Sequence, residues 1–298
     1  MRVNPQYVTN LVGAIDNTTA TIQGLTQELA SGVRLNSLAD DPGAAGQNVR
    51  LNAQLNQDVT FSQTASLTEG MLQVSDSALG GVVSQLTSAV SLATEANNGT
   101  LNAGNLASIS QQLAGIRDEV LSLANTTYLG QYVFAGSKGN TLPFQLDSTT
   151  VPATATYQGD SSVRSLETPN GQTIQLNVPG DQIFTAPAND VLTTLNRLVA
   201  DFAGGVPSAT AQADSQKLSS VLQYVGQQRV QIDNSLTRLQ AAASFSQTES
   251  TQLQASQTML IQADIAQIAT QLSSSKAQQT ALTQVMAQLG KGSLFDYL

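Results

Sequence analysis

The chain lacks three residue types entirely, because none of its 298 residues is cysteine, histidine or tryptophan. Without cysteine there is no disulfide and no thiol nucleophile, and without cysteine and histidine the usual zinc ligands and the usual general base at neutral pH are missing. Catalysis would have to rely on carboxylates, lysine, serine or tyrosine alone. We therefore expect a protein that is not an enzyme and has no cofactor.

Aromatic and charged side chains are also scarce, at 4% and 11% of the sequence. The apolar residues are mainly Ala, Leu, Val and Ile, set among Gln, Ser, Thr and Asn, and this composition favours thin helical bundles over wide sheets. The net charge is -9 and there is no basic cluster, so nucleic-acid binding has no electrostatic support.

Long apolar runs are absent as well. No run approaches the roughly 18 residues of a membrane span, so we expect no membrane insertion. Near the start of the sequence, polar residues and a proline interrupt any apolar segment that could act as a signal peptide. These residues are Asn4, Pro5, Gln6, Thr9 and Asn10. If the protein leaves the cell, we expect it to do so without a cleaved signal peptide.

What the sequence does contain is a heptad pattern at each end. The apolar positions of the first segment step by three and four, which predicts a helix over about 5–31 that ends at Gly32, a residue able to close a helix in the left-handed conformation. A second pattern occupies the last segment. The two apolar seams consist of Val8, Leu11, Ile15, Ile22, Leu25 and Leu29, and of Ile261, Ile265, Ile268, Leu272, Leu282, Met286 and Leu289.

The polar faces of these segments carry little charge, and only four charged residues lie between positions 250 and 298. A helix with an apolar seam and an uncharged polar face can be packed on all sides without burying unpaired ions. The seams therefore suit a subunit surrounded by copies of itself. An ordinary coiled coil between the two ends of one chain explains the periodicity equally well.

Between the two ends, helical and strand patterns alternate. Asp40 and Asp41 before Pro42 give a capping residue followed by proline at the first helical position, which predicts that a second helix begins there. The stretch 132–185 is rich in Gly, Pro and Thr and contains the Asn170-Gly171 turn signal, which indicates a small β-rich insertion. Helical spacing resumes at Val191.

The predicted fold is therefore mainly α. Long heptad-patterned helices from both termini form an elongated helical bundle or coiled coil, and a small β-rich insertion lies in the middle. We expect three parts: a terminal coiled-coil assembly domain of residues 1–40 and 255–298, a helical bundle domain of residues 41–131 and 186–254, and the insertion at 132–185.

Two terminal motifs carry a family resemblance. Residues 28–46, ELASGVRLNSLADDPGAAG, resemble the N-terminal block of bacterial flagellins and their junction relatives, and residues 293–298, SLFDYL, resemble the family's closing SLLDYL. The matching positions are Ser31, Gly32, Arg34, Asn36, Ser37, Asp40, Asp41 and Pro42, with Ser293, Leu294, Asp296, Tyr297 and Leu298 at the other end. A simple helix cap and an apolar tail would account for either motif by itself.

The middle of the chain resembles the junction branch of the same family. Residues 130–144, GQYVFAGSKGNTLPF, match its GxYLFAG element and the proline and phenylalanine that follow, and residues 157–160, YQGD, match its next motif. The signature positions here are Phe134, Ala135, Gly136, Pro143 and Phe144. One departure is the sequence Gln262-Ala263-Asp264, where the family often has an acidic pair.

The resemblance implies a structural subunit of the bacterial flagellum that acts as an adaptor at the hook–filament junction and polymerises through its terminal helices. It further implies export through the flagellar type III system and an extracellular location. The implied partners are copies of itself in a ring, a neighbouring hook-associated protein on the hook side, flagellin on the filament side, and an export chaperone that binds the C-terminal helix. Two alternatives remain open, a filament flagellin and a secreted coiled-coil effector or translocon protein.

Overall fold

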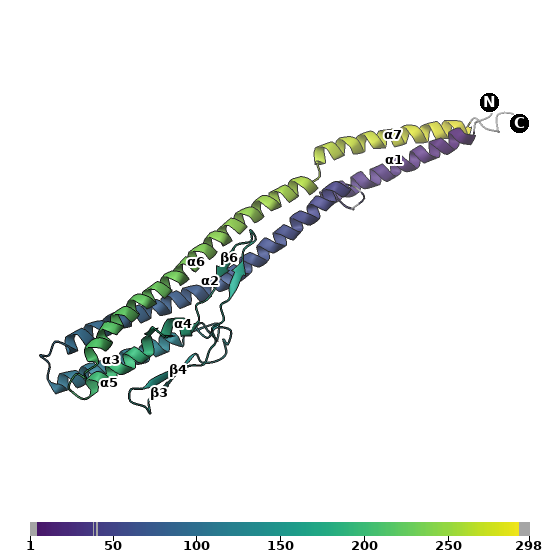
Figure 1. The fold of residues 1–298 in the computed structure, drawn as a ribbon. Helices are drawn as coiled ribbons and strands as arrows, with labels where there is room; N and C mark the ends of the chain where they lie inside the picture. The colour runs from purple at the N-terminus through teal and green to yellow at the C-terminus, as the bar shows by residue number, and fades with distance from the viewer. Residues whose placement is uncertain (1–4, 38, 40, 292–298) are drawn as a thin grey trace. The chain divides into compact units, whose positions relative to one another are not determined.

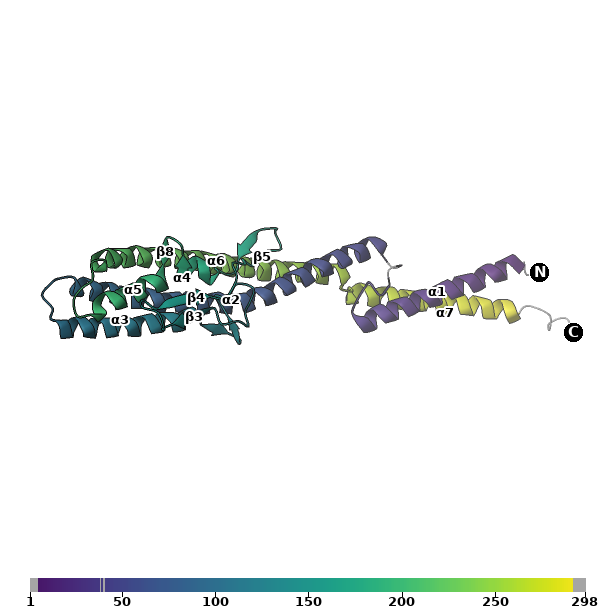
Figure 2. The same ribbon diagram turned by 60° about the horizontal axis from the view of Figure 1, so that its bottom comes forward.

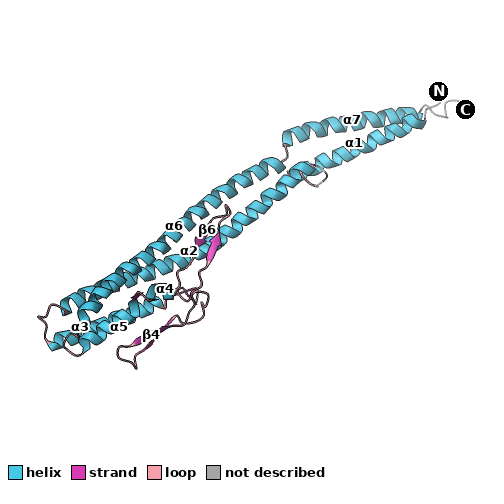
Figure 3. Ribbon diagram, viewed as in Figure 1, coloured by secondary structure: helices cyan, strands magenta, loops and turns pink. Residues whose placement is uncertain are grey.

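The computed structural model describes residues 5–37, 39 and 41–291 (Figure 1). Helices make up most of this part of the chain, and short strands occur only in its middle (Figure 3). The predicted fold class is therefore confirmed. The chain divides into two compact units, one of residues 1–56 and 249–298 and one of residues 57–248. The three-part division expected from the sequence stays a prediction.

Helix boundaries follow local capping chemistry. Helix α1 covers Pro5–Ser31 and is followed by Gly32 at a φ of +68°, so the predicted helix and its glycine stop are both confirmed. Helix α2 covers Pro42–Ala96, and the Asp41 carboxylate accepts a hydrogen bond of 3.0 Å from the backbone N–H of Ala44. Proline at the first position and an acidic cap before it therefore start α2 as expected.

The unit of residues 57–248 has a helical core. It contains most of α2, the helices α3 (Ala103–Ala124) and α5 (Val191–Ala203), and most of α6 (Ala211–Ile261). Leu72, Leu79 and Leu86 recur every seven residues on α2 and are at most 1% exposed. Each such burial contributes about 1.5–3 kcal/mol. Most of the apolar stability of the chain is therefore concentrated in this unit.

One ion pair links α2 to α6 within this unit. The Arg229 guanidinium on α6 donates to both carboxylate oxygens of Asp76 on α2, over 2.7 and 3.1 Å. A two-point contact of this geometry is directional as well as attractive. It therefore favours one alignment of the two long helices along their length.

Among the described residues, the strands form four separate antiparallel hairpins. They pair β1 (Thr127–Tyr128) with β2 (Gln131–Tyr132), β3 (Phe144–Asp147) with β4 (Thr154–Tyr157), β5 (Ser165–Glu167) with β6 (Thr173–Gln175), and β7 (Thr185–Ala186) with β8 (Asn189–Asp190). An isolated two-stranded hairpin is marginally stable in water. These hairpins therefore depend on the side chains that anchor them to the helices and to the short helix α4 (Gly180–Phe184).

The unit of residues 1–56 and 249–298 contains α1 and α7 (Ile265–Lys291), which lie side by side in two views (Figures 1 and 2). The predicted C-terminal seam is interrupted, because α6 ends at Ile261 and α7 begins only at Ile265. The Asp264 carboxylate explains the break, since it accepts hydrogen bonds from the backbone N–H groups of Ala266 and Gln267 and so caps a new helix.

Candidate assembly site

The paired terminal helices bury only part of their predicted seams. Leu11, Leu25 and Ile268 are 8%, 9% and 5% exposed, and Leu25 and Ile268 form a small apolar cluster with Ala263. The other seam positions are less covered. Ile15, Ile22, Ile261, Leu272, Leu282, Met286 and Leu289 are half-buried, and Val8, Leu29 and Ile265 are exposed.

Polar contacts between α1 and α7 are uncharged. Thr18 is buried on the seam, and its hydroxyl donates to the carbonyl of Ala14 on its own helix. Between the two helices, the side-chain amide of Gln279 donates to the Thr19 hydroxyl over 3.0 Å. No ion pair joins α1 to α7 among the described residues. The pair therefore holds together through a narrow apolar stripe, and its outer faces present few charges.

Those outer faces also carry apolar side chains. Tyr7 and Val12 on α1 are 51% and 41% exposed, and Ile265 and Val285 on α7 are 59% and 38% exposed. A two-helix pair cannot cover both sides of either helix, because each helix contacts one neighbour only. The remaining apolar surface is available for contact with further helices.

The N-terminal signature forms the connection between α1 and α2. The backbone N–H of Arg34 donates to the carbonyl of Ile261, and its guanidinium contacts both the Leu260 carbonyl and the Asp41 carboxylate, each over 3.2 Å. Carbonyls in the last turn of a helix have no partner within the helix. Arg34 therefore closes the end of α6 while it holds the cap of α2.

The remaining signature residues of this connection stabilise its backbone. Asn36 donates to the Val33 carbonyl, and the Ser37 hydroxyl accepts from the N–H of Ala39. The N–H of Ala44 and the neighbouring Arg34 guanidinium lower the pKa of Asp41 below its usual range. The Ser31 hydroxyl donates a hydrogen bond to the Val33 carbonyl in the same turn. Asp40 and the C-terminal signature of Ser293, Leu294, Asp296, Tyr297 and Leu298 lie outside the described residues.

The residues of the middle signature take part in a compact hydrogen-bond network. The carbonyl of Phe134 accepts from the N–H of Gly180 and from the Tyr157 hydroxyl, each over 2.9 Å. The Asp160 carboxylate accepts from the N–H and hydroxyl of Ser137 and from the N–H of Ser162. These bonds hold the chain after β2 against the chain before α4.

Glycine is required at one position of this hydrogen-bond network. Gly136 has a φ of +68°, and a Cβ atom there would lie 2.2 Å from the carbonyl oxygen of Asp160. Nearby, the Phe144 ring contacts the Tyr157 and Phe184 rings at centroid distances of 5.0 and 5.3 Å. Burial raises the pKa of Tyr157 to about 12, so its hydroxyl keeps its proton and remains a donor.

The sequence motifs did not identify every residue of this hydrogen-bond network. Asn125, which follows α3, donates its side-chain amide to the carbonyl of Phe144 and accepts from the N–H of the same residue, both over 2.9 Å. Pro143, which directly precedes Phe144 in the chain, is also buried. An asparagine directly after a helix is a common end signal, but nothing in the sequence indicates that its partner lies nineteen positions along the chain.

In the part of the chain that the structure describes, no three His, Cys, Asp or Glu side chains gather as metal ligands would. The helices of that part also include none with the length and apolar character that a membrane span needs.

The comparisons with known proteins agree with the sequence motifs. Residues 6–139 match the family of the bacterial flagellin N-terminal helical region. Flagellar hook-associated protein 3 of Salmonella typhimurium is 32% identical over 193 residues, and that of Escherichia coli is 29% identical over 187 residues. In both cases the match covers 62% of this chain and 57% of the relative. The chain thus spans little more than half the length of these curated relatives.

Solved structures share the fold. A protein of Vibrio parahaemolyticus described as a flagellar hook-associated protein superposes with a TM-score of 0.64 at 20% identity, covering 74% of this chain and 99% of that one. The flagellar junction protein FlgL of Legionella pneumophila superposes with a TM-score of 0.59 at 14% identity, covering 73% and 100%. The resemblance drawn from the motifs is therefore confirmed.

Replacing Gly136 by Ala is expected to destabilise the unit of residues 57–248 by about 1–3 kcal/mol, because the left-handed backbone and the Asp160 carbonyl leave no room for a Cβ atom. A matched control is Gly115→Ala on α3, where a Cβ would meet nothing and helix propensity predicts a gain of about 0.4–1 kcal/mol. Urea unfolding midpoints measure both changes. Equal unfolding midpoints for the two variants would contradict the requirement for glycine at position 136.

Replacing Asp160 by Asn is expected to lower the melting temperature in a pH-dependent way. Hydrogen bonds from Ser137 and Ser162 hold the pKa of Asp160 well below its usual range. The stabilisation by the charged form is therefore complete above the unfolded value of about 3.9 and is lost as the pH falls through the folded pKa. The melting-temperature difference from the native chain should be largest at pH 5–7 and should narrow below about pH 4. A constant difference would show that ionisation plays no part.

Proposed function

We propose that this chain, which carries the N-terminal helical region of bacterial flagellins, is a structural subunit of the bacterial flagellum and an adaptor at the hook–filament junction. The observation that carries the proposal is the similarity to hook-associated protein 3 over the shared region, together with the junction-branch motif around Phe134 to Phe144. Because the match spans only part of those relatives, their role is transferred here as a proposal.

The proposed mechanism is mechanical and uses no substrate. The terminal helices pair through one stripe and leave Val8, Val12, Ile265 and Val285 at least 37% exposed in a single copy. Polymerisation buries these side chains against neighbouring subunits. Because the polar faces are mainly uncharged, burial of several sides at once carries little of the desolvation penalty that unpaired ions would add.

The proposed route and partners are those that the resemblance implies. The chain is exported unfolded through the flagellar type III system to an extracellular position. It contacts copies of itself in a ring, a hook-associated protein on the hook side and flagellin on the filament side. An export chaperone binds the C-terminal helix before assembly, and the half-buried stripe of Leu272, Leu282 and Met286 on α7 offers it an apolar surface.

A filament flagellin is the second candidate. Flagellin 1 of Proteus mirabilis is 26% identical over 140 residues, covering 46% of this chain. The terminal helices alone suit either role. The two candidates differ in where the protein is found, because a filament subunit is distributed along the filament and an adaptor is confined to one short zone.

Deleting the gene from its own bacterium tests the proposal. We expect hooks without filaments and flagellin shed into the medium, both reversed by a plasmid copy. Immunogold labelling should mark only the junction. Labelling along the whole filament would favour the flagellin role, and normal filaments in the deletion strain would exclude the adaptor role.

Two substitutions on α7 separate folding from assembly. Ile268 is 5% exposed against α1, so Ile268→Asp should open the terminal pair within one copy, at a cost of several kcal/mol. Ile265 is 59% exposed, so Ile265→Asp should leave the pair intact and still prevent assembly. Circular dichroism of the purified chain reports the first effect, and filament counts report the second.

Export should persist in both variants, because it is proposed to act on the unfolded chain. The level of protein in the medium checks this point. Ile265→Leu is the matched control and should assemble normally. Normal filament numbers with Ile265→Asp would show that the outer face of α7 is not buried in the assembly.

A further inference from the structure

The turn of the β1–β2 hairpin has an unusual residue at its tip. Leu129 and Gly130 have φ angles of +49° and +78°, and Leu129 is the one non-glycine residue with a positive φ among those described. Two-residue turns of this kind favour Asn-Gly or Asp-Gly, because a branched apolar side chain strains the left-handed backbone.

Burial does not offset this strain within one copy. The Leu129 side chain is 77% exposed, so it gains little from leaving water. Strained residues persist where the surrounding structure or a function requires them. The contact that uses Leu129 is therefore expected to lie outside the single chain.

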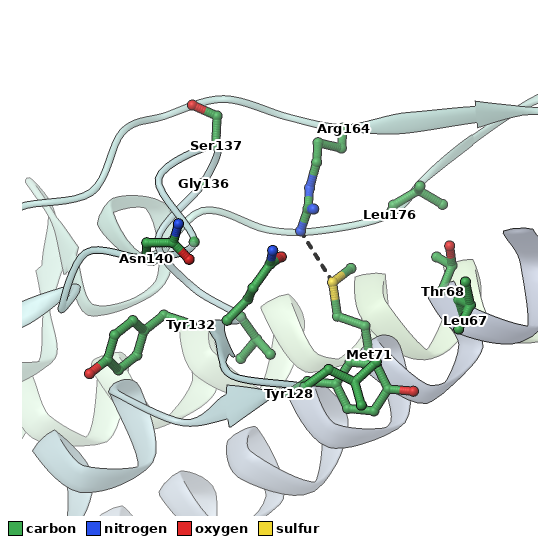
Figure 4. Close-up of a pocket in the computed structure, with 14 residues that line it drawn as sticks. Leu67, Thr68, Met71, Tyr128, Tyr132, Gly136, Ser137, Asn140, Arg164 and Leu176 are labelled. Atoms are coloured by element: carbon green, nitrogen blue, oxygen red, sulfur yellow. Dashed lines mark hydrogen bonds between the residues drawn. The ribbon is translucent and has the colours of Figure 1, made fainter.

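A pocket of about 380 Å³ lies directly beside the hairpin (Figure 4). It is bordered by α2, the hairpin, the loop 136–140 and the segment that leads into β5. Its rim carries a second apolar side chain, Leu67 of α2, which is 61% exposed. Its wall includes Tyr128, Tyr132 and Arg164, residue types that are enriched among the energetically important residues of protein interfaces.

Arg164 is the cation of this pocket, and it lacks a carboxylate partner. Its Nη2 atom points to the Met71 sulfur at 3.1 Å, as the dashed line in Figure 4 shows. A thioether sulfur is a weak acceptor, whereas the guanidinium has five N–H donors. In the described part of the chain, no carboxylate lies within ion-pair distance of Arg164. The pocket therefore combines an apolar rim with an exposed guanidinium whose remaining donors are free for a partner.

We propose that this pocket receives an aspartate or glutamate side chain of a second copy of the chain, with Leu129 and Leu67 packed around the contact. An Arg–carboxylate pair of this kind is directional and strong when partly shielded from water. The proposal rests on the proposed function, which places copies next to one another.

Charge favours a second copy as the occupant. The chain has 21 acidic and 12 basic residues, so nine carboxylates remain even if every cation is paired. A neighbouring copy is therefore net acidic and has carboxylates available to pair with Arg164. Arg164 offers a cation where the acidic surfaces of two copies would otherwise repel each other.

Replacing Leu129 by Asn is the most specific variant. Asparagine tolerates the left-handed backbone, so the melting temperature of the purified chain should stay the same or rise. Assembly should nevertheless fall, with at least tenfold fewer filaments in a deletion strain complemented by the variant. Val206→Asn, at a 71% exposed apolar site away from the hairpin, is the control and should restore filaments fully.

Arg164 is tested in the same strain. Arg164→Gln should lower filament numbers at least tenfold, and Arg164→Lys should retain part of the assembly because it keeps the charge but not the planar fork. The melting temperatures of both purified variants should remain close to that of the native chain. Normal filaments with Leu129→Asn or Arg164→Gln would overturn the proposal.

A photoreactive benzoylphenylalanine in place of Leu67 identifies the occupant in assembled flagella. A cross-link between two copies of this chain, through a peptide that contains Asp or Glu, is the expected product. A cross-link only to another protein, or no cross-link in assembled flagella, would overturn the inference. If the unmodified chain itself fails to restore filaments, the proposed function fails instead, so the two outcomes are distinguishable.

Discussion

The narrow contact between the terminal helices is the constraint on which the proposed assembly depends. Two helices packed side by side bury one stripe of each, and here that stripe is anchored by Leu11, Leu25 and Ile268. Most of the remaining seam is half-covered or open. Isolated helices gain little stability from propensity alone, so in the proposed assembly further neighbours provide the burial that one copy lacks. A subunit of this kind is incomplete until it is assembled.

The unit of residues 57–248, in contrast, buries its apolar side chains within one copy. Its leucine stripe on α2 is fully buried, and the Asp76–Arg229 pair joins the two long helices. The hydrogen bonds around Phe134 and Asp160 tie the segments between the hairpins to one another, and Asn125 after α3 joins them to the bundle through the Phe144 carbonyl. The unit of residues 57–248 therefore buries its own core, whereas the terminal pair leaves much of its predicted seams open.

The family motifs acquire physical roles in this arrangement. Gly32 and Asp41 end one helix and start the next, and Arg34 joins their connection to the end of α6. Gly136 allows the chain to pass next to the Asp160 carbonyl. Their arrangement specifies backbone geometry, in agreement with the structural role proposed for the chain.

The sequence by itself determined the helices, because heptad spacing, glycine stops and acidic caps act over a few residues and can be read locally. The start of α2 at Pro42 and the end of α1 at Ser31 are examples. Only the tertiary structure decided which seam residues are covered, since Ile265 and Ile268 share one pattern and differ in exposure by more than half of their surface. It also decided the partners of Asn125 and the open pocket beside Arg164. Those contacts depend on how distant segments meet, and periodicity carries no information about that.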